Sequence, residues 1–134
     1  MKMAEKSSDK SEWQIEDRWT PKLAKKWTPI SYAFLEFYSQ LNPPITSGEA
    51  MFIVHVMAHK WKKAAPYPSF KTLGKRMGIT HTQARNYARS LDTKGYLRRK
   101  FRVGRTNRFY FEGLYEALER CLDAKQPERE DEDD

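Results

Sequence analysis

Three helix starts in the middle of the chain constrain its fold more than any other feature. Thr46 and Thr80 each stand three residues before a Glu or a Gln, which is the capping-box pattern, and Ser69 is a further N-cap residue. Gly78 and Gly95 follow the second and third segments, where a glycine is typical of a helix end. The pattern predicts three consecutive helices.

The first of these helices covers residues 50–61 and is apolar around most of its circumference, so we expect it at the centre of the core. The other two helices are joined by a turn that contains Gly78, which predicts a helix-turn-helix. The second helix of the pair has an apolar side that should face inward. Its members are Ala84, Tyr87, Ala88 and Leu91.

A hairpin and one more helix are expected after Gly95. Residues 96–103 and 107–111 are rich in aromatic, β-branched and Arg residues around a Gly-Arg-Thr turn at residues 104–106, which predicts a β-hairpin. A last helix over about residues 112–124 has an apolar stripe. The stripe consists of Leu114, Ala117, Leu118, Cys121 and Leu122.

Residues 13–45 form an aromatic-rich extension ahead of these elements. The phrase Trp-Thr-Pro begins at Trp19 and again at Trp27, and Thr before Pro is a good helix start. From Pro29 the apolar residues keep the spacing of an amphipathic helix: Ile30, Ala33, Phe34, Phe37, Tyr38 and Leu41. The aromatic surface, with Trp13 at its start, is expected to cover either its own chain or a partner subunit.

The two ends of the chain differ from its body in composition. Residues 1–12 are polar and lack aromatics, and residues 126–134 hold six acids and one Arg, so we expect both to be disordered. The formal net charge is +7, but residues 1–125 carry +12. The acidic tail is expected either to stay solvated or to compete with phosphate for the basic surface.

Positive charge is concentrated between Lys71 and Arg108, where twelve Lys or Arg residues stand against one acid, Asp92. Grouped bases are attracted to a row of phosphates and release its counterions, so nucleic acid is the first partner to expect. A projection at 100° per residue turns four candidate base-contacting side chains outward from the helix over residues 81–94. They are Thr82, Arg85, Asn86 and Arg89. The alternative is an ordinary solvated helix face.

The other bases flank this helix face, and we expect them to contact the DNA backbone. The helix pair supplies Lys71, Lys75, Arg76 and His81. The hairpin supplies Arg98, Arg99, Lys100, Arg102, Arg105 and Arg108. Arg105, at the hairpin tip, would enter a minor groove or lie on phosphates. The alternative is that the charges keep the hairpin soluble or protect an edge strand.

Signs of catalysis are missing from the sequence. There is no Gly-rich phosphate loop, acidic metal cluster or nucleophile–base pair, so we expect no enzyme, no cofactor and no small-molecule ligand. His55 and His59 have a spacing that can hold a metal, but Val56 stands where a metalloprotease needs Glu, so we expect no metal. One of the two His residues should be hydrogen-bonded in the core and the other should lie near the surface.

The expected compartment is the cytoplasm. Cys121 is the sole cysteine and cannot form an internal disulfide, and its apolar stripe indicates inert packing. No apolar run approaches the roughly 20 residues that span a bilayer, and the N-terminus lacks a signal-peptide pattern, so we expect no membrane partner.

Two phrases carry a resemblance to a known family. Residues 68–80, Pro-Ser-Phe-Lys-Thr-Leu-Gly-Lys-Arg-Met-Gly-Ile-Thr, and residues 91–99, Leu-Asp-Thr-Lys-Gly-Tyr-Leu-Arg-Arg, resemble winged helix-turn-helix domains of bacterial DNA-binding proteins. The resemblance is closest to phage and plasmid replication initiators and to the N-terminal domain of DnaD-like primosome proteins. A similar wing often ends in Asn-x-(Phe/Tyr), here Asn107 to Phe109. The resemblance covers about residues 46–122.

The expected fold is mainly α with a small β-hairpin wing: a winged helix-turn-helix over residues 46–125, preceded by the aromatic helical extension. The expected function is sequence-specific binding of double-stranded DNA through a recognition helix at about 81–94 and a basic wing at about 96–111. The resemblance implies replication initiation in a bacterial, plasmid or phage replicon. A transcriptional regulator and a protein–protein adaptor of the same fold are alternatives. A homodimer through the extension or the last helix is also expected.

Overall fold

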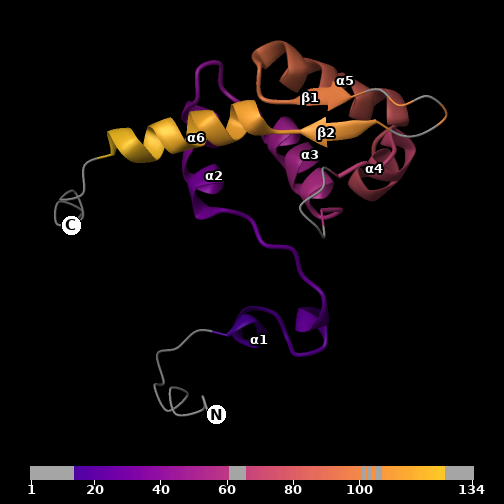
Figure 1. Ribbon diagram of the computed structural model, residues 1–134. Coiled ribbons are helices and arrows are strands. Elements are labelled where there is room, and N and C mark those ends of the chain that lie inside the picture. The colour runs from indigo at the N-terminus through magenta and orange to yellow at the C-terminus, as the bar shows by residue number, and fades with distance from the viewer. Residues whose placement is uncertain (1–13, 61–65, 101, 103, 105–106, 126–134) are drawn as a thin grey trace.

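The computed structural model of the chain describes residues 14–60, 66–100, 102, 104 and 107–125 (Figure 1). Some expectations concern residues outside these ranges, namely the expected disorder of residues 1–12 and 126–134, and the roles of Trp13 and Arg105. They stay predictions.

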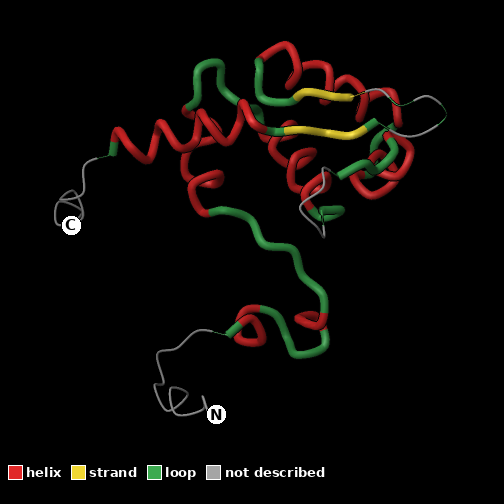
Figure 2. Tube along the Cα trace, viewed as in Figure 1, coloured by secondary structure: helices red, strands yellow, loops and turns green. Residues whose placement is uncertain are grey.

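Helices make up most of the described chain, and a small antiparallel hairpin completes it (Figure 2). The elements in order are α1 (Ile15–Arg18), the 3-10 helix η2 (Leu23–Lys25), α2 (Tyr32–Phe37), the 3-10 helix η3 (Tyr38–Gln40), α3 (Ser47–Met57), α4 (Phe70–Met77), α5 (His81–Lys94), β1 (Arg98–Lys100), β2 (Arg108–Tyr110) and α6 (Glu112–Ala124). In the hairpin Arg99 lies opposite Phe109. The prediction of a mainly α chain with a small β-hairpin is confirmed.

Both predicted capping boxes are confirmed. The Thr46 hydroxyl accepts from the Glu49 backbone N–H at 3.2 Å, and the Glu49 carboxylate accepts from the Thr46 N–H at 2.9 Å. Thr80 and Gln83 exchange the same two bonds at 3.0 and 2.9 Å. Each box satisfies two backbone donors that have no partner inside the helix, so α3 and α5 begin where the sequence indicates.

Local signals also set α4 and the ends of the helix pair. The Ser69 hydroxyl accepts from the Thr72 N–H at 3.0 Å and starts α4. Gly78 and Gly95 end α4 and α5 with φ of 73° and 90°, a left-handed conformation in which glycine is favoured. Residues 78–80 form the turn, and a Cβ at Gly74 would come within 2.8 Å of the Ile79 carbonyl, so this turn packs directly on α4.

Two predicted helix limits are wrong. The helix predicted from Pro29 begins at Tyr32, because the Ser31 hydroxyl accepts from the Ala33 N–H at 3.2 Å and supplies the cap. The helix predicted to reach residue 61 ends at Met57, since the next backbone bonds run to the third residue back and tighten the turn. Within the described residues, β1 begins two residues later than predicted, and β2 covers three of the five residues predicted for the second strand.

The core is centred on α3. Phe52, Ile53 and Val56 are buried, and Phe52 meets Phe109 of β2 edge to face with ring centroids 6.3 Å apart. The Phe109 N–H donates to the Pro66 carbonyl at 2.9 Å, so the segment before α4 runs along β2. Strand β2 is therefore held both by α3 and by the segment before α4.

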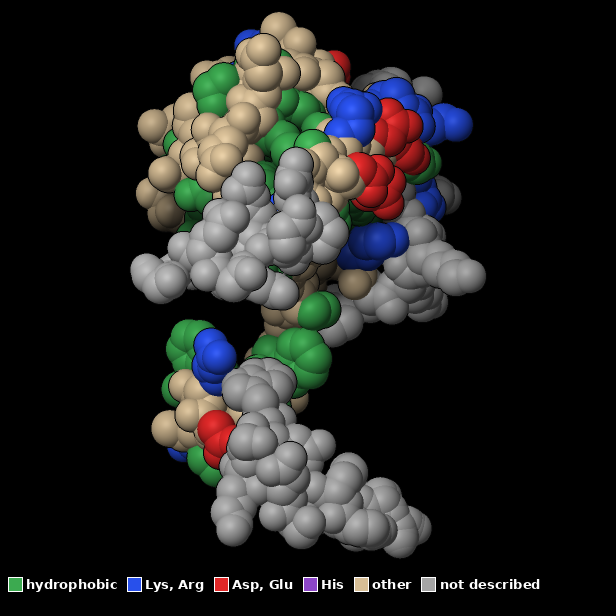
Figure 3. Space-filling view, turned by 90° about the vertical axis from the view of Figure 1, so that its left-hand side faces the viewer, with side chains coloured by type: hydrophobic (Ala, Val, Ile, Leu, Met, Phe, Trp, Pro, Cys, Tyr) green, Lys and Arg blue, Asp and Glu red, His purple; other side chains and the backbone are tan. Residues whose placement is uncertain are grey.

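The aromatic extension is divided between two places. From Ile30 onward it packs on α3 to α6, which we call the body, with α2 beside α6. Residues 14–28, which we call the arm, lie apart from the body (Figures 1 and 3). Within the arm α1 and η2 contact each other around the buried Ala24. The extension thus covers its own domain only in part.

Candidate nucleic-acid interface

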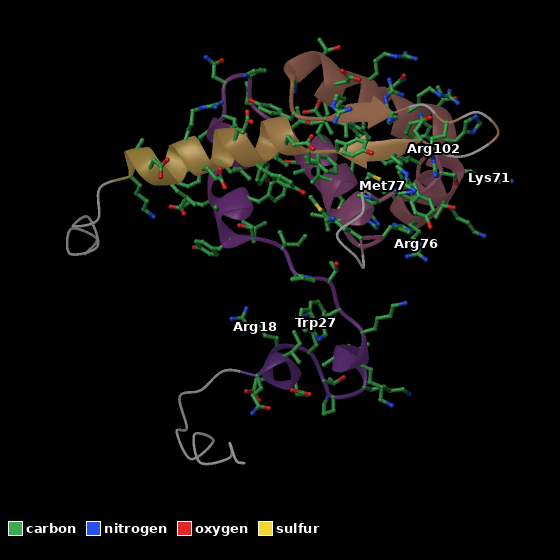
Figure 4. The ribbon with its side chains drawn as sticks, in the orientation of Figure 1. Arg18, Trp27, Lys71, Arg76, Met77 and Arg102 are labelled. Carbon is green, nitrogen blue, oxygen red and sulfur yellow. The ribbon has the colours of Figure 1, made fainter. Side chains whose placement is uncertain are left out.

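The basic residues of the helix pair and the hairpin lie at one end of the body. Lys71 and Arg76 of α4 and Arg102 of the hairpin are all found there, at the opposite end to the C-terminus of α6 (Figure 4). Lys71, Lys75 and Arg76 are exposed on α4, and Lys100 is exposed on β1. These four bases have the accessibility that a contact with phosphate requires.

The outer side of α5 presents three of the four candidate base-contacting residues. Thr82, Asn86 and Arg89 are exposed. Arg89 Nη1 lies 3.4 Å from Asn86 Oδ1, a long hydrogen bond that a stronger partner would replace at little cost. Gln83 is occupied in the capping box, as predicted. The exposed row therefore consists of short and long polar side chains one helical turn apart.

Arg85, the fourth candidate, lies on the side of α5 that faces α4. It is partly buried, and its guanidinium carbon is 5.7 Å from the centre of the Phe70 ring. A hollow of about 380 Å³ opens beside it. The hollow is lined by Pro68, Ser69, Phe70, Lys71, His81, Arg85, Asn107 and Phe109.

This hollow is electropositive. Lys71 and Arg85 carry full charges, and the starts of α4 and α5 both border it, so two helix dipoles point their positive ends toward it. His81 begins α5 and is exposed. Lys71 and His81, which are predicted to contact the DNA backbone, and Arg85, which is predicted to contact bases, thus lie together around this hollow.

Arg99 is engaged by contacts within the fold. It is partly buried, with its guanidinium 6.0 Å from the Phe70 ring, and its Nε lies 3.9 Å from an Asp92 oxygen. That Nε is buried and finds no hydrogen-bond partner among the described residues. The structure therefore shows Arg99 mainly as a link between the hairpin and the helix pair.

The neighbouring Arg98 is exposed on the hairpin. Its guanidinium lies 4.4 Å from the centre of the Tyr110 ring and 3.8 Å from Glu112. An exposed ion pair of this length contributes little to stability. Arg98 is therefore held over β2 by the ring and stays accessible to solvent.

Tyr67 belongs to this surface, and the sequence analysis did not identify it. Its side chain is 54% exposed. The guanidinium carbons of Arg102 and Arg108 lie 5.0 and 5.2 Å from its ring centre, within the range of a cation–π interaction. Prolines on both sides of Tyr67 are a signal of a stiff segment, but only the pairing of Pro66 with β2 brings the tyrosine to the hairpin.

Glu49 fixes the C-terminal end of α5 to α3. Its buried carboxylate accepts from the Lys94 ammonium at 2.7 Å and from the Ser90 hydroxyl at 2.5 Å. Burial raises the pKa of this carboxyl, but hydrogen bonds from Lys94, Ser90 and Thr46, together with the Lys94 charge, outweigh burial and hold the pKa below its ordinary 4.5. Lys94, one of the twelve bases between Lys71 and Arg108, is therefore engaged inside the fold.

Of the two central histidines, only His55 lies on α3. His59 lies beyond the end of α3, and its Nδ1 is 3.0 Å from the His55 carbonyl oxygen. Both side chains are partly buried, whereas one core and one surface residue were expected. Burial, then Arg76 and His59, lower the pKa of His55 from its ordinary 6.5. Within the described residues no three His, Cys, Asp or Glu side chains are grouped for a metal.

Comparison with known proteins gives no family for this chain. No protein-family model matches it, and no curated protein matches its sequence. Within the described ranges, none of the helices has both the length and the apolar character needed to cross a membrane. The site itself is therefore the basis for a functional assignment.

Proposed function

We propose that residues 46–125 form a winged helix-turn-helix that binds double-stranded DNA without catalysis. In this assignment α5 is the recognition helix, and β1 and β2 form the wing. The observation that carries the proposal is the exposed row of Thr82, Asn86 and Arg89 on α5, a helix that packs against the basic α4 and is followed in the chain by the basic hairpin.

The order of elements supports the fold assignment. A core helix, α3, is followed by the tightly joined pair α4 and α5 and then by the hairpin. The DNA major groove, about 12 Å wide, admits one α-helix. With α5 in the groove, the Asn86 amide would pair with an adenine edge and the Arg89 guanidinium with a guanine edge, since these are the bidentate pairings that the two side chains favour.

The flanking bases would hold the duplex backbone. We assign this role to six of them on α4 and the hairpin: Lys71, Lys75, Arg76, Lys100, Arg102 and Arg108. Each neutralised phosphate contributes about −0.9 to the slope of log affinity against log salt, so six contacts predict a slope of about −5. Affinity should then fall roughly a thousandfold between about 50 and 200 mM salt.

The cellular role that we propose is replication initiation in the cytoplasm of a bacterial host, for a chromosomal, plasmid or phage replicon. The resemblance of residues 68–80, 91–99 and 107–109 to replication-initiator domains supports this role. Transcriptional regulation would use the same interface, so enrichment of origin DNA over promoter DNA among bound genomic fragments separates the two.

Salt titration of binding to a labelled duplex, followed by fluorescence anisotropy, tests the proposal. The wild-type slope should be near −5, and Arg76→Ala should make it about 1 unit shallower. Arg120→Ala is the matched control, because it removes the same exposed charge from α6 at the other end of the body. Equal effects of the two substitutions, or no measurable binding by the wild type at low salt, would contradict the assignment.

A further inference from the structure

We propose that the arm of one chain docks into an apolar groove on a second copy of the same chain, so that two copies exchange arms. The groove lies between α2, the end of α3 and α6, and its volume is about 400 Å³. Its floor is apolar, with Phe34, Ile53 and Leu118. Tyr115 and Leu122 of α6 line it and are exposed.

The arm offers side chains that fit an apolar groove. Trp19, Leu23 and Trp27 are 57%, 61% and 51% exposed, an unusual amount of apolar surface for a segment of this size. Figure 3 shows the arm as a separate lobe below the body, with hydrophobic side chains on its surface. Because α1 and η2 contact each other around Ala24, the arm is already ordered before it docks.

Charge complementarity favours the same pairing. The arm carries Arg18, Lys22, Lys25 and Lys26 against two acids, Glu16 and Asp17. Along α6 the balance is reversed, with Glu112, Glu116, Glu119 and Asp123 against Arg120. Glu119 lines the groove itself, so a basic aromatic segment meets an acidic rim.

The path of the chain indicates a second copy as the source of the arm. Residues 29–31 line the groove, yet Trp27, only two residues earlier, lies in the arm, away from the body (Figure 4). Thr28 precedes Pro29, and a residue before proline is disfavoured in the helical conformation that a sharp reversal would need. The chain thus leaves the groove in an extended path, which directs its arm away from its own groove.

The area available is sufficient for a specific interface. An aromatic side chain buries about 150–250 Å², so the exposed parts of the two Trp residues and Leu23 amount to roughly 300 Å² in each arm. The groove surface that they cover doubles this area, and the second arm doubles it again. The total of roughly 1,200 Å² lies at the lower limit of stable interfaces.

Sedimentation equilibrium of the full chain tests this inference without DNA, so its failure is distinct from a failure of the DNA-binding proposal. The wild type should be a dimer, and Trp27→Ala and Leu122→Glu should each weaken dimerisation about tenfold or more. Tyr32→Ala is the control, because Tyr32 is exposed beside the groove but does not line it. It should leave the dimer unchanged.

Mixing the two variants tests the exchange itself. The Trp27→Ala chain keeps an intact groove, and the Leu122→Glu chain keeps an intact arm. The mixed dimer therefore has one intact arm–groove contact, and it should form more readily than a dimer of either variant with itself. A mixture that dimerises no better than its components would overturn the inference. A wild-type chain that stays monomeric at every soluble concentration, with its arm folded into its own groove or covered by another protein, would overturn it as well.

Discussion

Replacing Glu49 should destabilise the fold, because this one carboxylate joins α3 to the recognition helix we propose. It accepts hydrogen bonds from the Lys94 ammonium at 2.7 Å, from the Ser90 hydroxyl and from the Thr46 backbone N–H. Glu49→Ala removes the capping box and the ion pair together. The Ser90 hydroxyl and the Lys94 ammonium are then left beside a cavity.

The size of the effect follows from the two losses. Removing one partner of a buried ion pair costs about 3–5 kcal/mol, and the low end applies here because Lys94 is 20% exposed and can regain some water. Loss of the reciprocal cap adds about 1 kcal/mol. A total near 4 kcal/mol corresponds to a fall in Tm of about 15–30 °C for a domain of this size. Glu49→Gln keeps one acceptor oxygen and should cost about 1–2 kcal/mol.

Thermal melts followed by circular dichroism measure this prediction, with the exposed Glu116→Ala on α6 as control. The pKa of Glu49 is lowered in the folded protein, so its contribution is complete above pH 4.5 and is lost as pH falls through the folded pKa below that value. The wild type should therefore lose more stability than Glu49→Gln on acidification below pH 4.5. A Tm for Glu49→Ala within a few degrees of the wild type would refute this account of the carboxylate.

Three further predictions concern the helix contact at Gly113, the acid response of His55 and the tyrosine beside the hairpin. Gly113→Ala should destabilise the fold by about 1–3 kcal/mol in denaturant titrations, because the new Cβ would collide with the Gly95 carbonyl. The cost of this collision exceeds the usual gain in helix propensity from glycine to alanine. The pKa of His55 is lowered in the folded protein, so on acidification the unfolded chain takes up a proton at His55 before the folded chain does. The Tm should therefore fall as pH drops below 6.5, and His55→Gln should make this fall smaller in melts from pH 7 to 5. Tyr67→Ala should lower DNA affinity several-fold by releasing Arg102 and Arg108, whereas Tyr67→Phe should keep it, because the phenylalanine ring retains the cation–π face. Equal losses in the two Tyr67 variants would indicate a role for the hydroxyl instead.

The sequence predicts a helix end best where the capping side chain and the backbone group that it binds lie within four residues of each other. The capping boxes at Thr46 and Thr80, the cap at Ser69 and the glycine ends were all recognisable, because a hydroxyl three residues before an N–H has one favourable geometry. Helix α6 also occupies the predicted range. The start of α2 was missed because two competing caps, Thr28 and Ser31, stand three residues apart and only packing decides between them.

Long-range contacts account for the rest. A helical projection places Arg85 on the outer side of α5, but it cannot show that Phe70 offers a ring for its guanidinium. Arg99 is drawn to the same ring. The position of Tyr67 beside two hairpin arginines depends on a backbone bond between Pro66 and Phe109, more than 40 residues apart in the chain. Such contacts are decided by the tertiary fold and have no local pattern.

The most direct test of the DNA-binding assignment compares wild type and Asn86→Ala on a duplex selected by the wild type from a random pool. If the outer side of α5 makes base contacts, Asn86→Ala should lose about 1–3 kcal/mol, or roughly five- to 150-fold in affinity, on that duplex. A second selection with the variant should show a relaxed preference at one base position, while the salt slope stays near −5. Unchanged affinity and unchanged preference in Asn86→Ala would contradict the assignment of α5 as the recognition helix.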